Sequence, residues 1–356
     1  MPITRRRTLA GAAGLTAAAG LGRKARAATD ELIVTGYGGE YRELFIRTVI
    51  EPFEKKFSVK VTYDESSGTD PYPKIRATRG SPGFDVVGET TAPMVILGAK
   101  EKLFEPITEK EVPNLKYAFA KSASVIPAFG IVQTYQYLAL VWDTKTLEKP
   151  TSWLDYWQAG SRYGDKVKGH VITHGPSNFP LLIYSMIMGA RAKGGSETNL
   201  APAWDMLKTL KPYIGTVAST SAQAVPYMEN EQVWIMPFWS ARAALYAARG
   251  LPFGVTVPKE GTIALANCSA VPVGAANKKL AFAFLNFRLE PDIQKAFCEA
   301  YYTSPGRPDI AGFAPGFVDQ QITTEAKMAT MVFPDDALIA QKQRAWTLEW
   351  QEIMST

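Results

Sequence analysis

Hydrophobic positions early in the chain follow two alternating periods. The apolar run that ends at Thr35 stops at a glycine-rich turn, which predicts a buried strand. Residues 40–57 repeat apolar side chains at helical spacing, and residues 59–66 alternate as a strand does. Residues 72–80 then indicate a short helix, and residues 84–90 a further strand. This strand-helix-strand-helix-strand order predicts an α/β fold with an open, mostly parallel sheet.

A second set of predicted elements follows. Residues 131–143 are strand-like along their whole length, and residues 151–157 open a helix with Thr151 or Ser152 as its N-cap. Strand and helix patterns then alternate as far as a helical hairpin that is broken at Pro291. No flexible linker separates the halves. We therefore expect two α/β units with more than one crossing of the chain between them.

The N-terminal residues have the pattern of an export signal. Arg5, Arg6 and Arg7 precede a weakly apolar run, Leu9 to Gly22, of 14 residues. That run is too short to span a bilayer, which takes about 20 apolar residues. An Ala-x-Ala cleavage site follows at residues 25–27, so residues 1–27 are predicted to be a cleaved signal peptide of the twin-arginine type. The alternative is a basic, disordered N-terminal segment.

Charge and cysteine content narrow the function classes. The net charge is +5, but residues 1–27 hold six basic residues and no acidic ones, so the remaining chain is near −1. A nucleic-acid partner is not expected, because its main electrostatic driving force is missing. The chain has only two cysteines, Cys268 and Cys298, which excludes a disulfide-rich scaffold and leaves one bridge between them open.

Known catalytic and metal-binding motifs are absent from the sequence. It contains no G-x-S-x-G, P-loop or H-E-x-x-H motif, and the turn GYGGEY is not a dinucleotide fingerprint. His170 and His174 lie four residues apart on a predicted strand, but no cysteine or carboxylate lies nearby to complete a metal site. We therefore expect no metal, no cofactor and no enzymatic activity.

Aromatic and polar residues at strand ends are the candidates for ligand binding. Ligands of open α/β sheets bind at the carboxyl ends of the strands. Trp239 lies at such an end, where its ring is suited to form a cleft wall and to face a cation. Arg242, in the first turn of the next helix, is suited to bind a carboxylate but is equally compatible with an ordinary surface charge. Trp234 and Phe238 are expected to be core residues.

Three segments resemble a known family. Residues 226–241 (PYMENEQVWIMPFWSA), residues 250–297 and residues 302–309 (YTSPGRPD) resemble polyamine-type extracellular solute-binding proteins, the receptors of ABC importers for spermidine and putrescine. The resemblance implies a periplasmic protein with the two-lobed type II periplasmic-binding-protein fold, in which hinge closure clamps the ligand between the lobes. Residues 28–139 with 266–305 would form one lobe, and residues 140–265 with 306–356 the other.

The resemblance also implies candidate ligand contacts. Trp239 and Tyr37 match aromatic walls of the cleft, and Glu89 and Thr90 lie in a loop that contacts ligand in the family. Where polyamine receptors supply a tryptophan and an aspartate, this chain has Leu265 and Asn267. The full set of expected ligand-binding residues is Tyr37, Glu89, Thr90, His174, Ser177, Asn178, Trp239, Arg242 and Asn267.

These substitutions bear on the solute. Buried ammonium groups need carboxylates or aromatic faces, and the turn from His174 to Asn178 carries no acid. A polyamine or related amine is the first expectation. An amino-acid-like, opine-like or carboxylate solute is the alternative, with Arg242 holding a carboxylate and Glu89 an amine. An exported enzyme that uses Cys268 as nucleophile is a third reading. The expected partners are a small solute and an inner-membrane ABC permease, with the protein itself a monomer.

Overall fold

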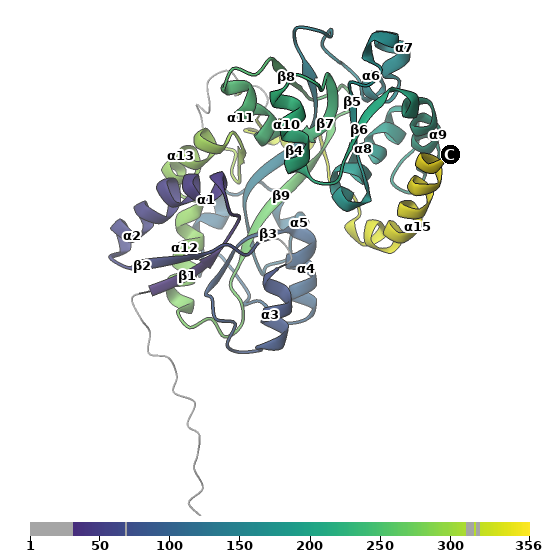
Figure 1. The fold of residues 1–356 in the computed structure, drawn as a ribbon. Helices are drawn as coiled ribbons and strands as arrows, with labels where there is room; N and C mark the ends of the chain where they lie inside the picture. Colours follow the sequence, from purple (N-terminus) through teal and green to yellow (C-terminus); the bar gives the residue numbers. More distant parts are fainter. Residues whose placement is uncertain (1–30, 68–69, 311–316, 318–320) are drawn as a thin grey trace, which may run out of the picture.

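The computed structural model describes residues 31–67, 70–310, 317 and 321–356. The predicted signal peptide lies outside these residues. Two lobes are joined by two long strands that run from one lobe into the other (Figure 1). No helix in the described part of the chain combines the length and the apolar character that crossing a bilayer requires.

The first lobe is built on three parallel strands at one end of the sheet. These are β1 (Glu31–Thr35), β2 (Lys60–Asp64) and β3 (Val86–Thr91), with β1 between the other two. Its helices are α1 (Glu40–Phe45), α2 (Glu51–Phe57), α3 (Pro71–Ala77), α4 (Ala92–Lys100), α5 (Ser122–Val125), α12 (Lys278–Arg288) and α13 (Pro291–Tyr301), and a π-helical turn, Ile46–Ile50, joins α1 to α2. The expected helix over residues 40–57 is therefore interrupted once.

The second lobe repeats this plan at the other end of the sheet. Its strands are β5 (Val171–His174), β6 (Ile214–Ala218), β7 (Ile235–Trp239) and β8 (Phe253–Thr256). Its helices are α6 (Trp153–Trp157), α7 (Ala159–Tyr163), α8 (Phe179–Ala192), α9 (Ala201–Leu210), α10 (Ser221–Glu229) and α11 (Ser240–Ala248). Ser152 caps α6, as predicted: its side chain accepts a hydrogen bond from the Leu154 N–H, and Asp155 completes a capping box.

The two long strands, β4 (Ile131–Asp143) and β9 (Thr262–Ala270), carry the connection between lobes. Strand β4 pairs with β9 as far as Tyr137, with β7 from Leu138 onward and with β8 from Leu140 onward. All the pairings of these strands with one another and with β3 and β7 are antiparallel. The expectation of a mostly parallel sheet is thus correct at each end and wrong in the middle, because the crossing strands return through the sheet in opposite directions.

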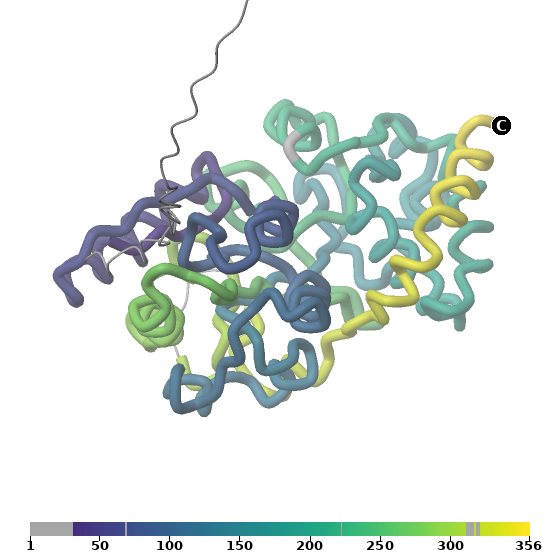
Figure 2. The backbone as a smooth tube through the Cα atoms, turned by 90° about the horizontal axis from the view of Figure 1, so that it is seen from below, coloured from purple at the N-terminus to yellow at the C-terminus, as the bar shows by residue number. Residues whose placement is uncertain are grey.

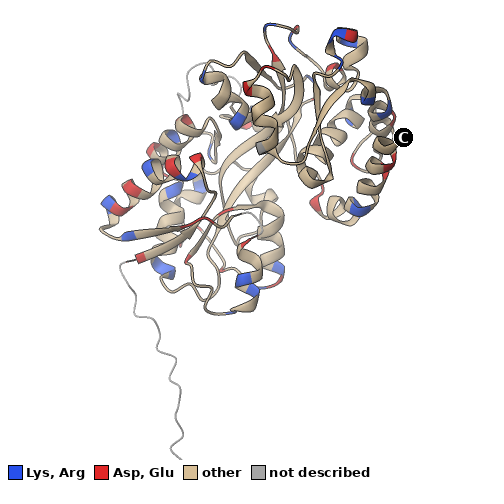
Figure 3. Ribbon diagram, viewed as in Figure 1, with Lys and Arg blue, Asp and Glu red and all other residues tan. Residues whose placement is uncertain are grey.

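A third segment reaches the second lobe near the C-terminus. It contains β10 (Ser304–Pro305), α14 (Glu325–Ala329) and β11 (Met331–Val332), which pairs with the start of β9. Helix α15 (Asp336–Ser355) follows and packs along α9 on the outside of the second lobe (Figure 2). Charged residues gather on the outer helices of both lobes and are sparse on the crossing strands (Figure 3).

Candidate functional site

A cavity of about 550 Å³ lies between the lobes beside strand β9. One wall comes from the first lobe and consists of α4 together with Lys121 and the end of α5. The floor is Ala264, Leu265 and Ala266 of β9. The opposite wall comes from the second lobe and consists of Tyr184 of α8 and the segment from Phe333 to Ala340 that begins α15. Both lobes and a crossing strand therefore surround one space.

Charges of both signs line this otherwise largely apolar cavity. The first-lobe wall contributes Lys100 and Lys121, and the start of α15 contributes Asp335 and Asp336. Asp335 caps α15 by accepting hydrogen bonds from the N–H groups of Ala337 and Leu338. Burial raises the pKa of Asp336 to about 6, although a hydrogen bond from Tyr184 opposes this shift. Asp336 is therefore the acid in this cavity that an incoming cation would stabilise most.

Trp239 does not line the cavity itself but contacts a residue that does. Its ring meets Tyr184 edge to face, with centroids 6.3 Å apart, at the carboxyl end of β7. Tyr184, and not Trp239, lines the cavity. Phe238 is fully buried, as expected of a core residue, whereas Trp234 is partly exposed and stacks on His170.

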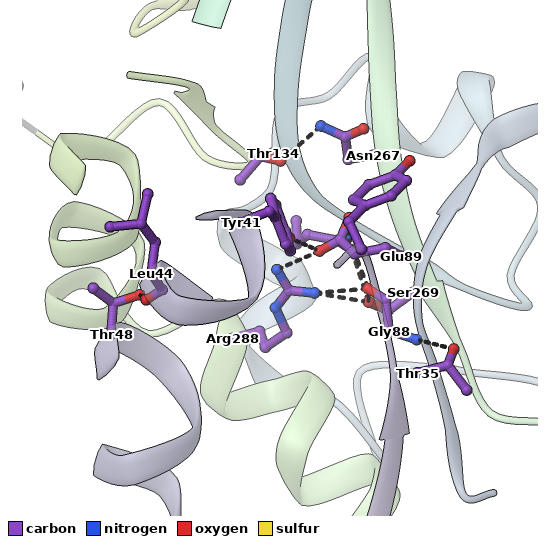
Figure 4. A network of polar contacts seen from close by, with 12 residues as sticks. Thr35, Tyr41, Leu44, Thr48, Gly88, Glu89, Thr134, Asn267, Ser269 and Arg288 are labelled. Carbon is purple, nitrogen blue, oxygen red and sulfur yellow. Dashed lines mark hydrogen bonds and ion pairs between the residues drawn. The ribbon is translucent and has the colours of Figure 1, made fainter. Parts of the chain in front are cut away.

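Glu89 lies in a buried network of the first lobe (Figure 4). Its side chain is 1% exposed and pairs with the 2% exposed Arg288 of α12, at 3.0 Å between Oε1 and Nη2. The Tyr41 hydroxyl donates to Oε1, and the Gln133 amide donates to Oε2 at 3.0 Å. These donors occupy both carboxylate oxygens, so Glu89 is paired with residues of the protein itself.

Arg288 ties the same network to the sheet. Its guanidinium donates to the Gly88 carbonyl at 2.8 Å and to the Ser269 hydroxyl at 3.1 Å, which links β3 to β9. The guanidinium also lies 4.7 Å from the centroid of the Phe45 ring. Tyr37 packs edge to face on Tyr41 and is therefore held by the network at the end of β1.

Asn267 presents a buried acceptor beside the cavity floor. Its Nδ2 donates to the Thr134 hydroxyl at 3.1 Å, which fixes the orientation of the amide (Figure 4). Its Oδ1 is buried and has no hydrogen-bond partner. An unsatisfied buried carbonyl is costly, so this position favours a ligand that donates an N–H or O–H. Thr90 is buried on the neighbouring strand.

His174 is part of the buried end of β5. Its Nε2 hydrogen-bonds the Pro237 carbonyl at 2.8 Å, and its Nδ1 accepts from the Asn178 amide at 3.2 Å. Burial lowers the pKa of His174 to about 4. Asn178 is thus committed to His174, whereas Ser177 is exposed in the same turn. The two histidines do not converge on a common site, and the described residues contain no cluster suited to a metal.

The depressed pKa of His174 leads to a direct prediction. Because the folded-state pKa lies below the ordinary value of about 6.5, His174 contributes stability that is complete above that pH and is lost as pH falls toward 4. Nuclear magnetic resonance of the two histidine rings should show one ring that remains neutral at pH 5. A His174→Gln variant should lose that resonance and should destabilise less steeply between pH 6.5 and pH 4 in urea titrations. Two rings that both titrate near pH 6.5 would contradict the prediction.

Arg242 and Cys268 complete the set of candidates. The Arg242 charge lies near Tyr301 and opposes the rise that burial causes in the pKa of its hydroxyl, and α11 of the second lobe contacts α13 of the first. Cys268 and Cys298 are free thiols, and both are fully buried. Burial, and the nearby Glu89 charge, raise the pKa of Cys268 well above its usual range, which disfavours a nucleophilic thiolate.

None of the nine predicted ligand-binding residues lies on the lining of this cavity. Two lining residues, Tyr184 and Asp336, had no signal in the sequence pattern. Tyr184 lies inside an almost wholly buried helix, and Asp336 lies in a helix that the hydrophobic pattern does not predict. Leu265, expected where relatives carry an aromatic ring, does lie on the floor.

Comparison with known proteins gives a consistent picture. The sequence profile of bacterial extracellular solute-binding proteins matches residues 48–330. The spermidine/putrescine-binding periplasmic protein of Escherichia coli K12 is 25% identical over 271 residues, covering 72% of this chain and 73% of that protein. The gamma-aminobutyric acid-binding protein of Pseudomonas aeruginosa is 24% identical over 312 residues, 84% of each chain.

Solved structures share the fold. An extracellular solute-binding protein from Bordetella parapertussis superposes with a TM-score of 0.77 at 22% identity, covering 91% of this chain and 99% of the other. The spermidine/putrescine substrate-binding protein PotD of Streptococcus pneumoniae gives 0.74 at 19% identity, with the same coverage of 91% and 99%. The two-lobed fold is thus common to these chains.

Proposed function

Because this chain belongs to the bacterial extracellular solute-binding proteins, we propose that the cavity beside β9 is its solute site and that an ammonium group of the solute binds Asp336. The protein is the periplasmic solute-binding component of an ABC transporter and works with a membrane permease. The observation that carries the proposal is Asp336 itself: a carboxylate on an apolar cavity wall, with its pKa raised by burial. An ammonium ion would remove the cost of ionising it.

The remaining polar groups favour a zwitterionic solute over a diamine. Lys100 and Lys121 lie on the wall opposite Asp336, where the carboxylate of an ω-amino acid would find a positive charge. The second ammonium of putrescine would meet the same lysines. We therefore place a small amino-acid-like solute first and a polyamine second, which reverses the order that the resemblance suggests.

Thermal unfolding with a panel of solutes tests this order. The panel consists of gamma-aminobutyrate, longer ω-amino acids, putrescine, spermidine and an opine. A solute at 100 times its dissociation constant should stabilise the folded protein by about 2.7 kcal/mol, a shift that is readily measured. Stabilisation by the amino acids alone supports the zwitterion, and stabilisation by the diamines alone would contradict it. A panel without any effect would sink the assignment of an amine site.

The other expectations belong to the same proposal. The lobes consist of residues 28–139 with 266–305 and of residues 140–265 with 306–356, and the change of partners along β4 at Leu138 supports the first of these boundaries. The protein acts as a monomer, without nucleic acid or cofactor.

It performs no chemistry on its solute. The Cys268 thiol, the nucleophile that an enzyme on this fold would use, is fully buried, which argues against enzymatic activity. Of the other expected contacts, we keep Tyr37 and Trp239 as residues that support the walls.

A further inference from the structure

Two polar contacts join the lobes on the side where α11 faces α1 and α13 (Figure 1). Arg249, at the end of α11, forms an ion pair with Glu40, the first residue of α1. Two turns earlier on α11, Arg242 lies near the Tyr301 hydroxyl of α13, where its positive charge opposes the rise that burial causes in the pKa of Tyr301. Positions seven apart lie on one face of a helix, so both arginines point toward the first lobe.

The Glu40–Arg249 pair differs from the other ion pairs of the chain in what it connects. Among the pairs whose two partners both fall in the described ranges, the others each link elements within one lobe. Neither Glu40 nor Arg249 lines the cavity. Their side chains are 43% and 50% exposed, so the pair is accessible to salt and is not part of a core.

A contact of this kind acts on the arrangement of the lobes. Glu40 and Arg249 belong to different lobes, so the pair forms in the relative position of the lobes described here and is lost when the lobes move apart. Exposed ion pairs typically contribute about 0.2–1 kcal/mol. That range corresponds to a shift of about 1.4-fold to 5-fold in the ratio of closed to open molecules.

We propose that Glu40 and Arg249, together with the Arg242–Tyr301 contact, form a latch that holds the two lobes in position around the solute and favours closure before the solute arrives. This α1–α11 latch sets solute affinity without touching the solute. It rests on the proposed function in one respect, which is that the solute binds between the lobes. The latch itself is a property of the solute-free protein.

Pulsed electron paramagnetic resonance on the solute-free protein tests the latch. Spin labels at Lys55→Cys on α2 and Lys208→Cys on α9 report the distance between lobes, and the two native cysteines are fully buried. We expect Glu40→Lys to move up to about five-fold more molecules into a longer-distance population. Adding Arg249→Glu should restore the original distribution, and about 1 M salt should remove the difference between wild type and Glu40→Lys.

A matched control lies within the second lobe. Lys145 and Glu231 form an ion pair of similar exposure, 62% and 47%, with Nζ and Oε1 2.9 Å apart. Glu231→Lys should leave the interlobe distances unchanged. Identical distributions for wild type, Glu40→Lys and the charge-swapped double variant at low salt would overturn the latch. Because no solute is used, that outcome would leave the proposed solute site untouched, and an inactive solute panel would leave the latch untouched.

Discussion

Replacing Arg288 by methionine is expected to lower the free energy of unfolding by about 3–5 kcal/mol at pH 7. The variant keeps most of the side-chain volume but leaves the Glu89 carboxylate, at 1% exposure, without its cationic partner. The hydrogen bonds from the guanidinium to Gly88 of β3 and Ser269 of β9 are also lost. Urea denaturation monitored by tryptophan fluorescence measures the loss.

The pH dependence identifies the cause of that loss. Burial already raises the pKa of Glu89, and Arg288 is the main group that opposes this rise. Without Arg288 the carboxyl should stay protonated to higher pH. A raised folded-state pKa gives stability that is present at low pH and is lost as pH rises through that pKa. The Arg288→Met variant should therefore recover stability from pH 8 to pH 5.

Two further variants separate the charge from the side chain. Glu89→Gln combined with Arg288→Met removes the unpaired charge and should regain much of the stability, because the buried pair then becomes neutral. Lys145→Met is the matched control, since the side chains of its pair with Glu231 are 62% and 47% exposed and little change is expected. A loss for Arg288→Met no larger than that of Lys145→Met would show that the buried pair contributes little.

Replacing Asp336 by asparagine should weaken binding of an amine-bearing solute about 10-fold to 100-fold, or about 1.4–2.8 kcal/mol. The same change should stabilise the solute-free protein at pH 7. The pKa of Asp336 is raised to about 6, so its ionisation costs folding free energy as pH rises through 6. Asparagine never ionises and avoids that cost. Weaker binding together with higher stability would identify Asp336 as a residue that serves binding and destabilises the folded protein.

Asp335 provides the control for this prediction. It caps α15 and asparagine is an equally good N-cap, and its side chain is exposed, so Asp335→Asn should change affinity and stability much less than Asp336→Asn does. Calorimetric titration with gamma-aminobutyrate and putrescine, and urea denaturation at pH 5 and pH 7.5, provide both measurements. Wild-type affinity for the amine should fall between pH 7.5 and pH 5 as Asp336 takes up a proton. Unchanged affinity in Asp336→Asn would remove this residue from the solute site.

The sequence predicts the strands of this fold better than it predicts its C-terminal helix. Strand β1 and the second half of β4, from Tyr137 to Trp142, are nearly continuous apolar runs, and that pattern is visible without a structure. Helix α15 spans 20 residues, but only Ile339, Trp350 and Ile353 are buried. With one narrow face packed on the second lobe, its hydrophobic period is too weak to mark it as a helix.

The site is harder to predict because its residues are paired by the fold. Glu89 lies at a strand end, where a ligand contact is expected. Its partner Arg288 belongs to α12, much later in the sequence, and no residue near Glu89 predicts this pairing. Arg242 was equally open to two roles, and the structure gives it a partner in Tyr301. The sequence shows which polar side chains lie at strand ends, but it does not show which distant residues form ion pairs or hydrogen bonds with them.

The crossing of β4 and β9 has a consequence for how the protein is made. The first lobe needs β9, α12 and α13, so it cannot be completed until about residue 301 has been synthesised. The second lobe needs α15, which begins only at Asp336. Neither lobe can finish folding while the ribosome still holds its missing strand or helix. The nascent chain should therefore remain a substrate for chaperones through most of its synthesis, and neither lobe should be obtainable as a truncated fragment.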